Sequence, residues 1–121
     1  MIVGIGIDMI EIQRVVKACE KESFLKKYFT VAEQELIAAD IKKAADNFAV
    51  KEAVSKVFGT GFREISPIEI ECLRDELGKP YVNLHGKANE YAQKISLAKL
   101  HVSITNTKEL STAVAVGETV E

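Results

Sequence analysis

The feature that most constrains the fold is residues 44–58, AADNFAVKEAVSKVF, a helical pattern that is apolar around nearly its whole circumference. A helix of this kind is normally buried. Gly59 follows the segment, and glycine readily takes the left-handed conformation after a last helical turn. The segment nevertheless carries Glu52 and Lys56. We therefore expect a buried helix that carries an acid and a base.

At about 100° per residue, Ala45, Ala49, Glu52 and Lys56 fall on one stripe of this helix. Two small side chains would leave space beside the acid and the base, which indicates a lined groove. The alternative is a solvated Glu52–Lys56 pair at i, i+4 spacing, which would stabilise the helix by about 0.2–0.5 kcal/mol. The pattern by itself leaves both interpretations open.

The other elements follow from apolar periodicity and turn residues. Residues 2–7 predict a buried strand, and residues 9–22 predict an amphipathic helix. Thr30 and Glu33 form a capping box that begins a second helix ending near Asp40. After the third helix, a hairpin, a helix and two more strands are expected at residues 68–73, 81–84, 87–97, 100–105 and 111–117. The order β-α-α-α-β-β-α-β-β, with antiparallel hairpins, predicts one α+β domain over residues 1–121.

Charge and cysteine content narrow the possible partners. Sixteen Lys and Arg against eighteen Asp and Glu give a formal charge of −2, which argues against general affinity for nucleic acid. Cys19 and Cys72 have no second cysteine or histidine at ligand spacing, so we expect reduced core thiols. No signal-peptide pattern and no run of membrane-spanning length is present, which predicts a cytoplasmic protein without a membrane partner.

Two further segments offer chemistry, each beside an ordinary structural explanation. Asp8 follows the first strand, where a carboxylate could face a ligand, but Asp8 and Glu11 also have the spacing of a helix cap. The segment 59–61, Gly-Thr-Gly, offers backbone amides and a hydroxyl to phosphate oxygens, but it is also a common helix stop. Neither GIGID nor KVFGTG matches a dinucleotide or P-loop motif.

Four motifs occur in fixed order along the chain, namely GIGIDMIEIQR, FAVKEAVSKVFGTG, GKP and VSITNT. In this combination the chain resembles the holo-acyl-carrier-protein synthase family, whose patterns are approximately GIGID-x-x-E-I-x-R, RFA-x-KEA-x-x-K-x-x-GTG, GKP and SISHT. The resemblance implies a 4′-phosphopantetheinyl transferase-like fold. It also implies an enzyme of fatty acid biosynthesis that transfers the 4′-phosphopantetheine moiety of coenzyme A to a serine of apo-acyl carrier protein, releasing 3′,5′-ADP.

The resemblance assigns catalytic roles to Asp8, Glu52 and Lys56. Asp8 and Glu52 would hold a Mg²⁺ cofactor that also binds the pyrophosphate, as suits an ion that prefers a few carboxylates plus phosphate and water. Glu52 would also accept the proton of the carrier serine, directly or through a water. Lys56 would stabilise charge on the pyrophosphate as 3′,5′-ADP leaves. The positions that match residues lining coenzyme A are Lys56, Gly59, Thr60, Gly61, Pro80, Ser103 and Asn106.

Two kinds of protein partner are implied by the same resemblance. Family members are homotrimers with active sites between subunits, so the apolar excess of residues 44–58 would be interface. The acidic carrier protein would dock on Arg14, Lys17 and Lys21. An ordinary solvated basic face explains the same three residues.

Two positions depart from the family motifs. Asn47 stands where an arginine is usual, and Asn106 stands where a histidine is usual. The positive charge of the arginine and the titratable ring of the histidine, both expected near the nucleotide phosphates, are therefore missing. Affinity for coenzyme A would fall unless Lys42, Lys43 or Lys51 compensates. A second hypothesis is therefore a catalytically weakened relative that binds coenzyme A or acyl carrier protein. A third, a purely structural trimerising domain, leaves the acid–base stripe unexplained.

Overall fold

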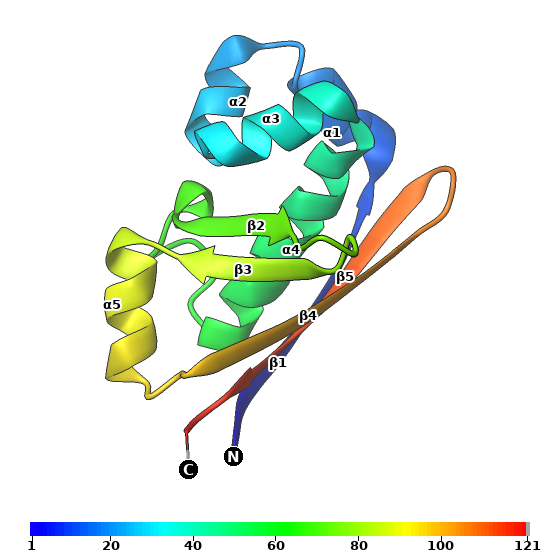
Figure 1. The fold of residues 1–121 in the computed structure, drawn as a ribbon. Coiled ribbons are helices and arrows are strands. Elements are labelled where there is room, and N and C mark those ends of the chain that lie inside the picture. The colour runs from blue at the N-terminus through cyan, green and yellow to red at the C-terminus, as the bar shows by residue number, and fades with distance from the viewer. Residues whose placement is uncertain (121) are drawn as a thin grey trace.

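Helix α4 (Lys42–Phe58) runs through the middle of the computed structural model, which describes residues 1–120 (Figure 1). Strands β1 and β5 pack against it, and α1, α3 and β2 cover other parts of its surface. The predicted burial of this helix is confirmed. The interpretation of its apolar excess as subunit interface is wrong, because the side chains of α4 are covered by other elements of the same chain.

The larger sheet has three antiparallel strands, in the order β1 (Ile2–Glu11), β5 (Leu110–Glu118) and β4 (Lys99–Asn106). One face of this sheet lies on α4. Gly4 and Gly6 face the helix, where an added Cβ would collide with the backbone of Val57 and Ala53. The two glycines therefore allow β1 and α4 to approach closely.

The opposite face of β1 is not covered by any element of residues 1–120. Because strand residues alternate between faces, the neighbours of the buried glycines point away from α4. Ile5, Ile7 and Met9 are 64%, 59% and 63% exposed. This row of apolar side chains is called the outer β1 face below.

The remaining elements lie around α4 in two groups. Helices α1 (Ile12–Ala18), α2 (Glu22–Tyr28) and α3 (Val31–Ala39) gather at one end of the molecule (Figure 1). The short hairpin of β2 (Ile70–Arg74) and β3 (Pro80–Leu84) lies in front of α4, preceded by the 3₁₀ turn η1 (Pro67–Glu69) and followed by α5 (Gly86–Lys94). The α+β fold class is confirmed.

The N-terminal region differs from the sequence prediction. Strand β1 continues to Glu11, because β5 supplies hydrogen-bonding partners as far as the Glu11–Leu110 pair. The first helix therefore begins at Ile12 instead of Met9, and residues 22–28 form the additional helix α2. The capping box of Thr30 and Glu33 is present as predicted.

Both cysteines are buried and unpaired, as predicted. Burial raises the pKa of Cys72 to about 11, so its thiol is neutral at physiological pH. Over residues 1–120, none of the helices is both long and apolar enough to span a membrane.

Candidate active site

Asp8 and Lys56 meet where β1 crosses α4. Asp8 shares the strand face of Gly4 and Gly6, so its carboxylate points toward the helix. The Lys56 Nζ lies 3.3 Å from Asp8 Oδ1 and donates to the Ile7 carbonyl oxygen at 2.7 Å. The structure thus joins a carboxylate and an ammonium group that are far apart in the sequence.

Glu52 lies one helical turn before Lys56. The charges of Asp8 and Lys56 both act on its carboxyl group. Burial raises the pKa of Glu52 most strongly, and the carboxylate of Asp8 raises it further. The ammonium of Lys56 partly opposes these effects. Two carboxylates that repel each other at a partly buried site are stabilised by a cation placed near both.

The donor set fits a Mg²⁺ ion bound together with a substrate. Mg²⁺ is commonly held by one or two carboxylates, with phosphate and water oxygens completing its shell. Asp8 and Glu52 provide two such carboxylates. Within residues 1–120, no cluster of three or more His, Cys, Asp or Glu side chains suited to a metal occurs, so a metal here would need oxygen ligands from the substrate or water. Lys56 is 51% exposed and can leave Asp8 when another cation arrives.

Several structural explanations of these residues are ruled out. Asp8 is not a helix cap, because it pairs with Ala113 inside β1, and Glu11 precedes α1 without a side-chain cap bond. Ala45 and Ala49 do not line a groove, because both are fully buried in the core.

The Gly-Thr-Gly loop follows directly from the end of α4. Gly59 caps the helix with a φ of 78°, and Gly61 also has a positive φ of 61°. The Thr60 hydroxyl donates to the Gly61 carbonyl at 2.9 Å. A Cβ added at either glycine would meet no atom within 4 Å, so the space in front of this loop is open.

The other predicted coenzyme A positions are dispersed in a single chain. Pro80 begins β3 and pairs with Arg74. Ser103 is exposed on β4 and faces away from α4, because its neighbours Val102 and Ile104 pack into the core. One chain therefore does not place Ser103 beside Asp8.

Asn106 makes a specific contact with α4. Its Nδ2 donates to Asp46 Oδ1 at 3.0 Å, and the buried Ser111 hydroxyl donates to the same oxygen at 2.7 Å. The asparagine at this position is thus held by the helix instead of being free at the surface.

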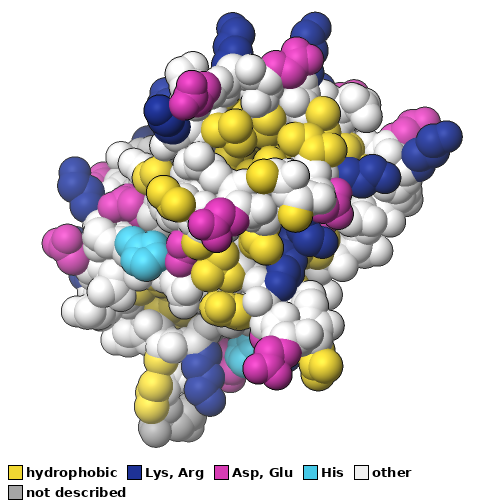
Figure 2. All heavy atoms as spheres, turned by 45° about the horizontal axis from the view of Figure 1, so that its top comes forward, with side chains coloured by type: hydrophobic (Ala, Val, Ile, Leu, Met, Phe, Trp, Pro, Cys, Tyr) yellow, Lys and Arg dark blue, Asp and Glu magenta, His cyan; other side chains and the backbone are white. Residues whose placement is uncertain are grey.

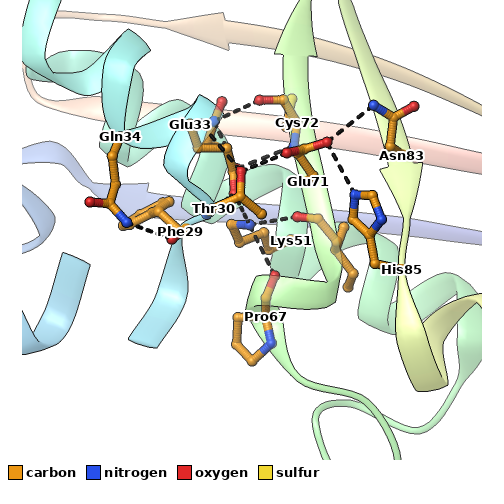
Figure 3. A network of polar contacts seen from close by, with 12 residues as sticks. Phe29, Thr30, Glu33, Gln34, Lys51, Pro67, Glu71, Cys72, Asn83 and His85 are labelled. Atoms are coloured by element: carbon orange, nitrogen blue, oxygen red, sulfur yellow. Dashed lines mark hydrogen bonds and ion pairs between the residues drawn. The ribbon is translucent and has the colours of Figure 1, made fainter. Parts of the chain in front are cut away.

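A buried polar network, which the sequence analysis did not predict, links α3, α4 and β2 (Figure 3). Lys51 Nζ donates to Glu33 Oε1 at 2.8 Å and to the Pro67 carbonyl at 2.9 Å, and both charged side chains are fully buried. Glu33 Oε2 accepts from Asn47 Nδ2 at 2.9 Å and from the Cys72 amide at 3.2 Å. The only sequence signal was a lysine within an otherwise apolar helical face.

This network changes the interpretation of two residues. Lys51 cannot compensate for missing charge near a nucleotide, because its ammonium is held by Glu33 and backbone carbonyls in the interior. Asn47 is likewise fully buried, and its amide donates to Glu33 and to the Cys72 carbonyl. Neither side chain faces the Asp8 and Lys56 pair.

The predicted docking residues lie together on the surface. Arg14, Lys17 and Lys21 are exposed and line a groove of about 450 Å³ with Phe24. A second groove of about 620 Å³ shares Arg14 and Phe24 and is otherwise mainly apolar. On this end of the molecule, hydrophobic side chains are bordered by lysine and arginine (Figure 2).

Comparison with known proteins places these features in a family. The sequence profile of the 4′-phosphopantetheinyl transferase superfamily matches residues 4–115. A holo-[acyl-carrier-protein] synthase from Lachnoclostridium phytofermentans is 64% identical over 118 residues, covering 98% of this chain and 97% of the relative. A protein of the same name from Clostridium novyi is 43% identical over 122 residues, covering 98% and 88%.

Solved structures agree with these sequence matches. The Plasmodium yoelii acyl carrier protein synthase with ADP bound has a TM-score of 0.89 and 30% identity, covering 100% of this chain and 98% of the other. The Bacillus anthracis holo-(acyl-carrier-protein) synthase in complex with CoA (3′,5′-ADP) has a TM-score of 0.81 and 33% identity, covering 99% of each chain.

Proposed function

Because this chain belongs to the 4′-phosphopantetheinyl transferase superfamily, we propose that it is a holo-acyl-carrier-protein synthase acting in the cytoplasm. It transfers the 4′-phosphopantetheine moiety of coenzyme A to a serine of apo-acyl carrier protein, for fatty acid biosynthesis. The observation that carries the proposal is the meeting of Asp8, Glu52 and Lys56 at the crossing of β1 and α4. Relatives that carry this enzyme name cover nearly the whole chain.

In the proposed reaction, each residue of the cluster has a separate task. Asp8 and Glu52 would hold Mg²⁺, which when bound would supply positive charge against the pyrophosphate. Glu52 would receive the proton of the carrier serine, directly or through a water. Lys56 moves from Asp8 to the phosphates and stabilises the leaving group.

The bonds balance as in other phosphoryl transfers. The serine oxygen forms a bond to the phosphorus that carries the pantetheine arm. The bond from that phosphorus to the bridging pyrophosphate oxygen breaks, and 3′,5′-ADP leaves with the electron pair. The serine proton passes to Glu52.

Mass spectrometry of apo-acyl carrier protein incubated with this protein, coenzyme A and Mg²⁺ tests the function. The expected result is a carrier heavier by one phosphopantetheine group, and no such product after the metal is chelated. Coenzyme A binding without any mass increase would support the catalytically weakened relative instead. Failure both to bind coenzyme A and to modify the carrier would leave only a structural role.

We also propose that the protein acts as a homotrimer with active sites between subunits. The outer β1 face supports this assembly, because a continuous row of exposed Ile5, Ile7 and Met9 is better buried against another subunit. Ser103 belongs to the face of the sheet opposite α4, and a neighbouring subunit could therefore bring it to the site.

Light scattering is expected to report a trimer for the wild-type protein and a smaller species for Ile5→Lys. The lysine would place a charge within the outer β1 face, where desolvation on assembly is costly. Val31→Lys is the matched control, because Val31 is 73% exposed on α3, outside the outer β1 face. A monomeric wild-type protein, or a trimeric Ile5→Lys variant, would contradict the proposed interface.

Charge reversal of the basic groove tests carrier docking. The double variant Arg14→Glu, Lys17→Glu should lower kcat/KM for the acidic carrier by roughly tenfold or more at low salt, because charges at an interface rim mainly steer encounter. The effect should shrink as salt screens the charges. Coenzyme A binding should be unchanged.

The matched control for docking is Lys87→Glu, Lys94→Glu, which makes the same charge change at exposed positions of α5. This control should retain most of the wild-type carrier kinetics. Equal losses in both double variants would show an effect of net charge alone, and the Arg14 and Lys17 surface would then not be the docking site.

A further inference from the structure

Arg74, the last residue of β2, carries a half-buried positive charge. Its Nη1 donates to Cys72 Sγ at 3.2 Å and to the Leu73 carbonyl at 3.3 Å. The thiol is neutral, since burial raises the pKa of Cys72 to about 11. In the part of the chain that the structure describes, the ion pairs do not include Arg74.

Two unsatisfied buried atoms lie around Cys72. Among residues 1–120, Arg74 Nη2 finds no hydrogen-bond partner, and neither does Asn47 Oδ1. The same Asn47 side chain donates to the Cys72 carbonyl, so both atoms border one residue. A buried polar atom without a partner destabilises the folded protein, and more so when it is charged. A buried group of this kind can gain its partner from a ligand, an ion or a water.

Arg74 lies among residues already connected with coenzyme A. It pairs with Pro80 across the β2–β3 hairpin. Cys72 contacts both Arg74 and Asn47 of α4, and Asn47 adjoins Asp46, which holds Asn106. Pro80 and Asn106 were both predicted to line the coenzyme A site.

We propose that Arg74 binds a phosphate group of coenzyme A and supplies the positive charge that Asn47 does not provide. This inference rests on the proposed function, since it takes coenzyme A as the ligand. A guanidinium group binds phosphate through parallel N–H bonds, and rotation of the half-exposed side chain turns Nη2 from the interior toward the bound nucleotide. Asn47 is neutral, so it does not repel the Arg74 guanidinium group.

Calorimetry with the full-length protein and Mg²⁺ tests this role. Arg74→Met keeps an apolar stem but removes the charge, and it should weaken coenzyme A binding roughly tenfold to hundredfold. Its melting temperature should be unchanged or higher, because an uncompensated half-buried charge is lost. Arg74→Lys should retain part of the affinity. Lys94→Met, which removes one exposed charge from α5, should bind coenzyme A normally.

The outcomes separate a ligand role from a structural one. A loss with coenzyme A but not with 3′-dephospho-coenzyme A assigns Arg74 to the 3′-phosphate, and an equal loss with both assigns it to the pyrophosphate. Unchanged affinity of Arg74→Met, with or without a lower melting temperature, overturns the inference and leaves the proposed function intact. If the wild-type protein binds no coenzyme A, both this inference and the proposed function are contradicted.

Discussion

Glu52→Gln is expected to lower phosphopantetheine transfer by roughly a hundredfold to ten-thousandfold while the protein stays folded. Glutamine keeps the volume of the side chain and can still form hydrogen bonds. It offers Mg²⁺ no negative oxygen and cannot take the serine proton. Single-turnover mass spectrometry of the carrier, combined with a Mg²⁺ titration, measures both losses.

The stability of the same variant distinguishes a catalytic residue from a structural one. The pKa of Glu52 is raised in the folded protein, so ionisation of its carboxyl group disfavours the folded state as pH rises through that pKa. Glu52→Gln should therefore unfold at neutral pH no more easily than the wild type. A Glu52–Lys56 pair that only stabilises the helix predicts the opposite sign, with a loss of about 0.5 kcal/mol or less.

Asp8→Asn provides the companion measurement. If both carboxylates hold one metal ion, Asp8→Asn should lose transfer to a similar degree. The double variant should then be scarcely worse than either single variant, because residues that act as a unit are not additive. Near-normal turnover by a folded, trimeric Glu52→Gln protein would contradict the proposed roles of Glu52 as metal ligand and proton acceptor.

The largest loss of stability is expected for Lys51→Met, at about 3–5 kcal/mol. The substitution leaves the Glu33 carboxylate fully buried without its countercharge. It also leaves the carbonyl oxygens of Pro67 and Ile70 without the donor they share. Urea denaturation monitored by circular dichroism measures the free energy of unfolding.

A surface lysine of the same helix is the control. Lys43 pairs with the exposed Asp40 at 3.9 Å, and exposed pairs contribute about 0–1 kcal/mol. Lys43→Met should therefore change stability little. Glu33→Gln combined with Lys51→Met should destabilise by less than the sum of the single changes, because the second change removes the unpaired charge. A loss below about 1 kcal/mol for Lys51→Met would show that the interior tolerates the unpaired carboxylate.

Lys51 and Lys56, two of the lysines of α4, show how much could be predicted from the sequence. Periodicity predicted that the helix is buried and that Lys56 shares a stripe with Glu52. It could not separate the environments of Lys51 and Lys56, since both lie within an apolar pattern. Their roles depend on which elements pack on each side of α4. Lys51 meets Glu33 from α3, and Lys56 meets Asp8 from β1.

Local sequence signals determined the elements whose causes are themselves local. The Thr30 and Glu33 capping box, the left-handed Gly59 and the alternation of β4 and β5 act over a few residues, and the structure contains each of them. Tertiary structure alone decided the length of β1, because its last residues pair with Leu110 and its neighbours from the far end of the chain. It also decided the partners of Asn47, since the packing of β2 on α4 brings this side chain to the Cys72 carbonyl. Contacts between segments distant in sequence depend on the packing of the whole chain, which no local pattern encodes.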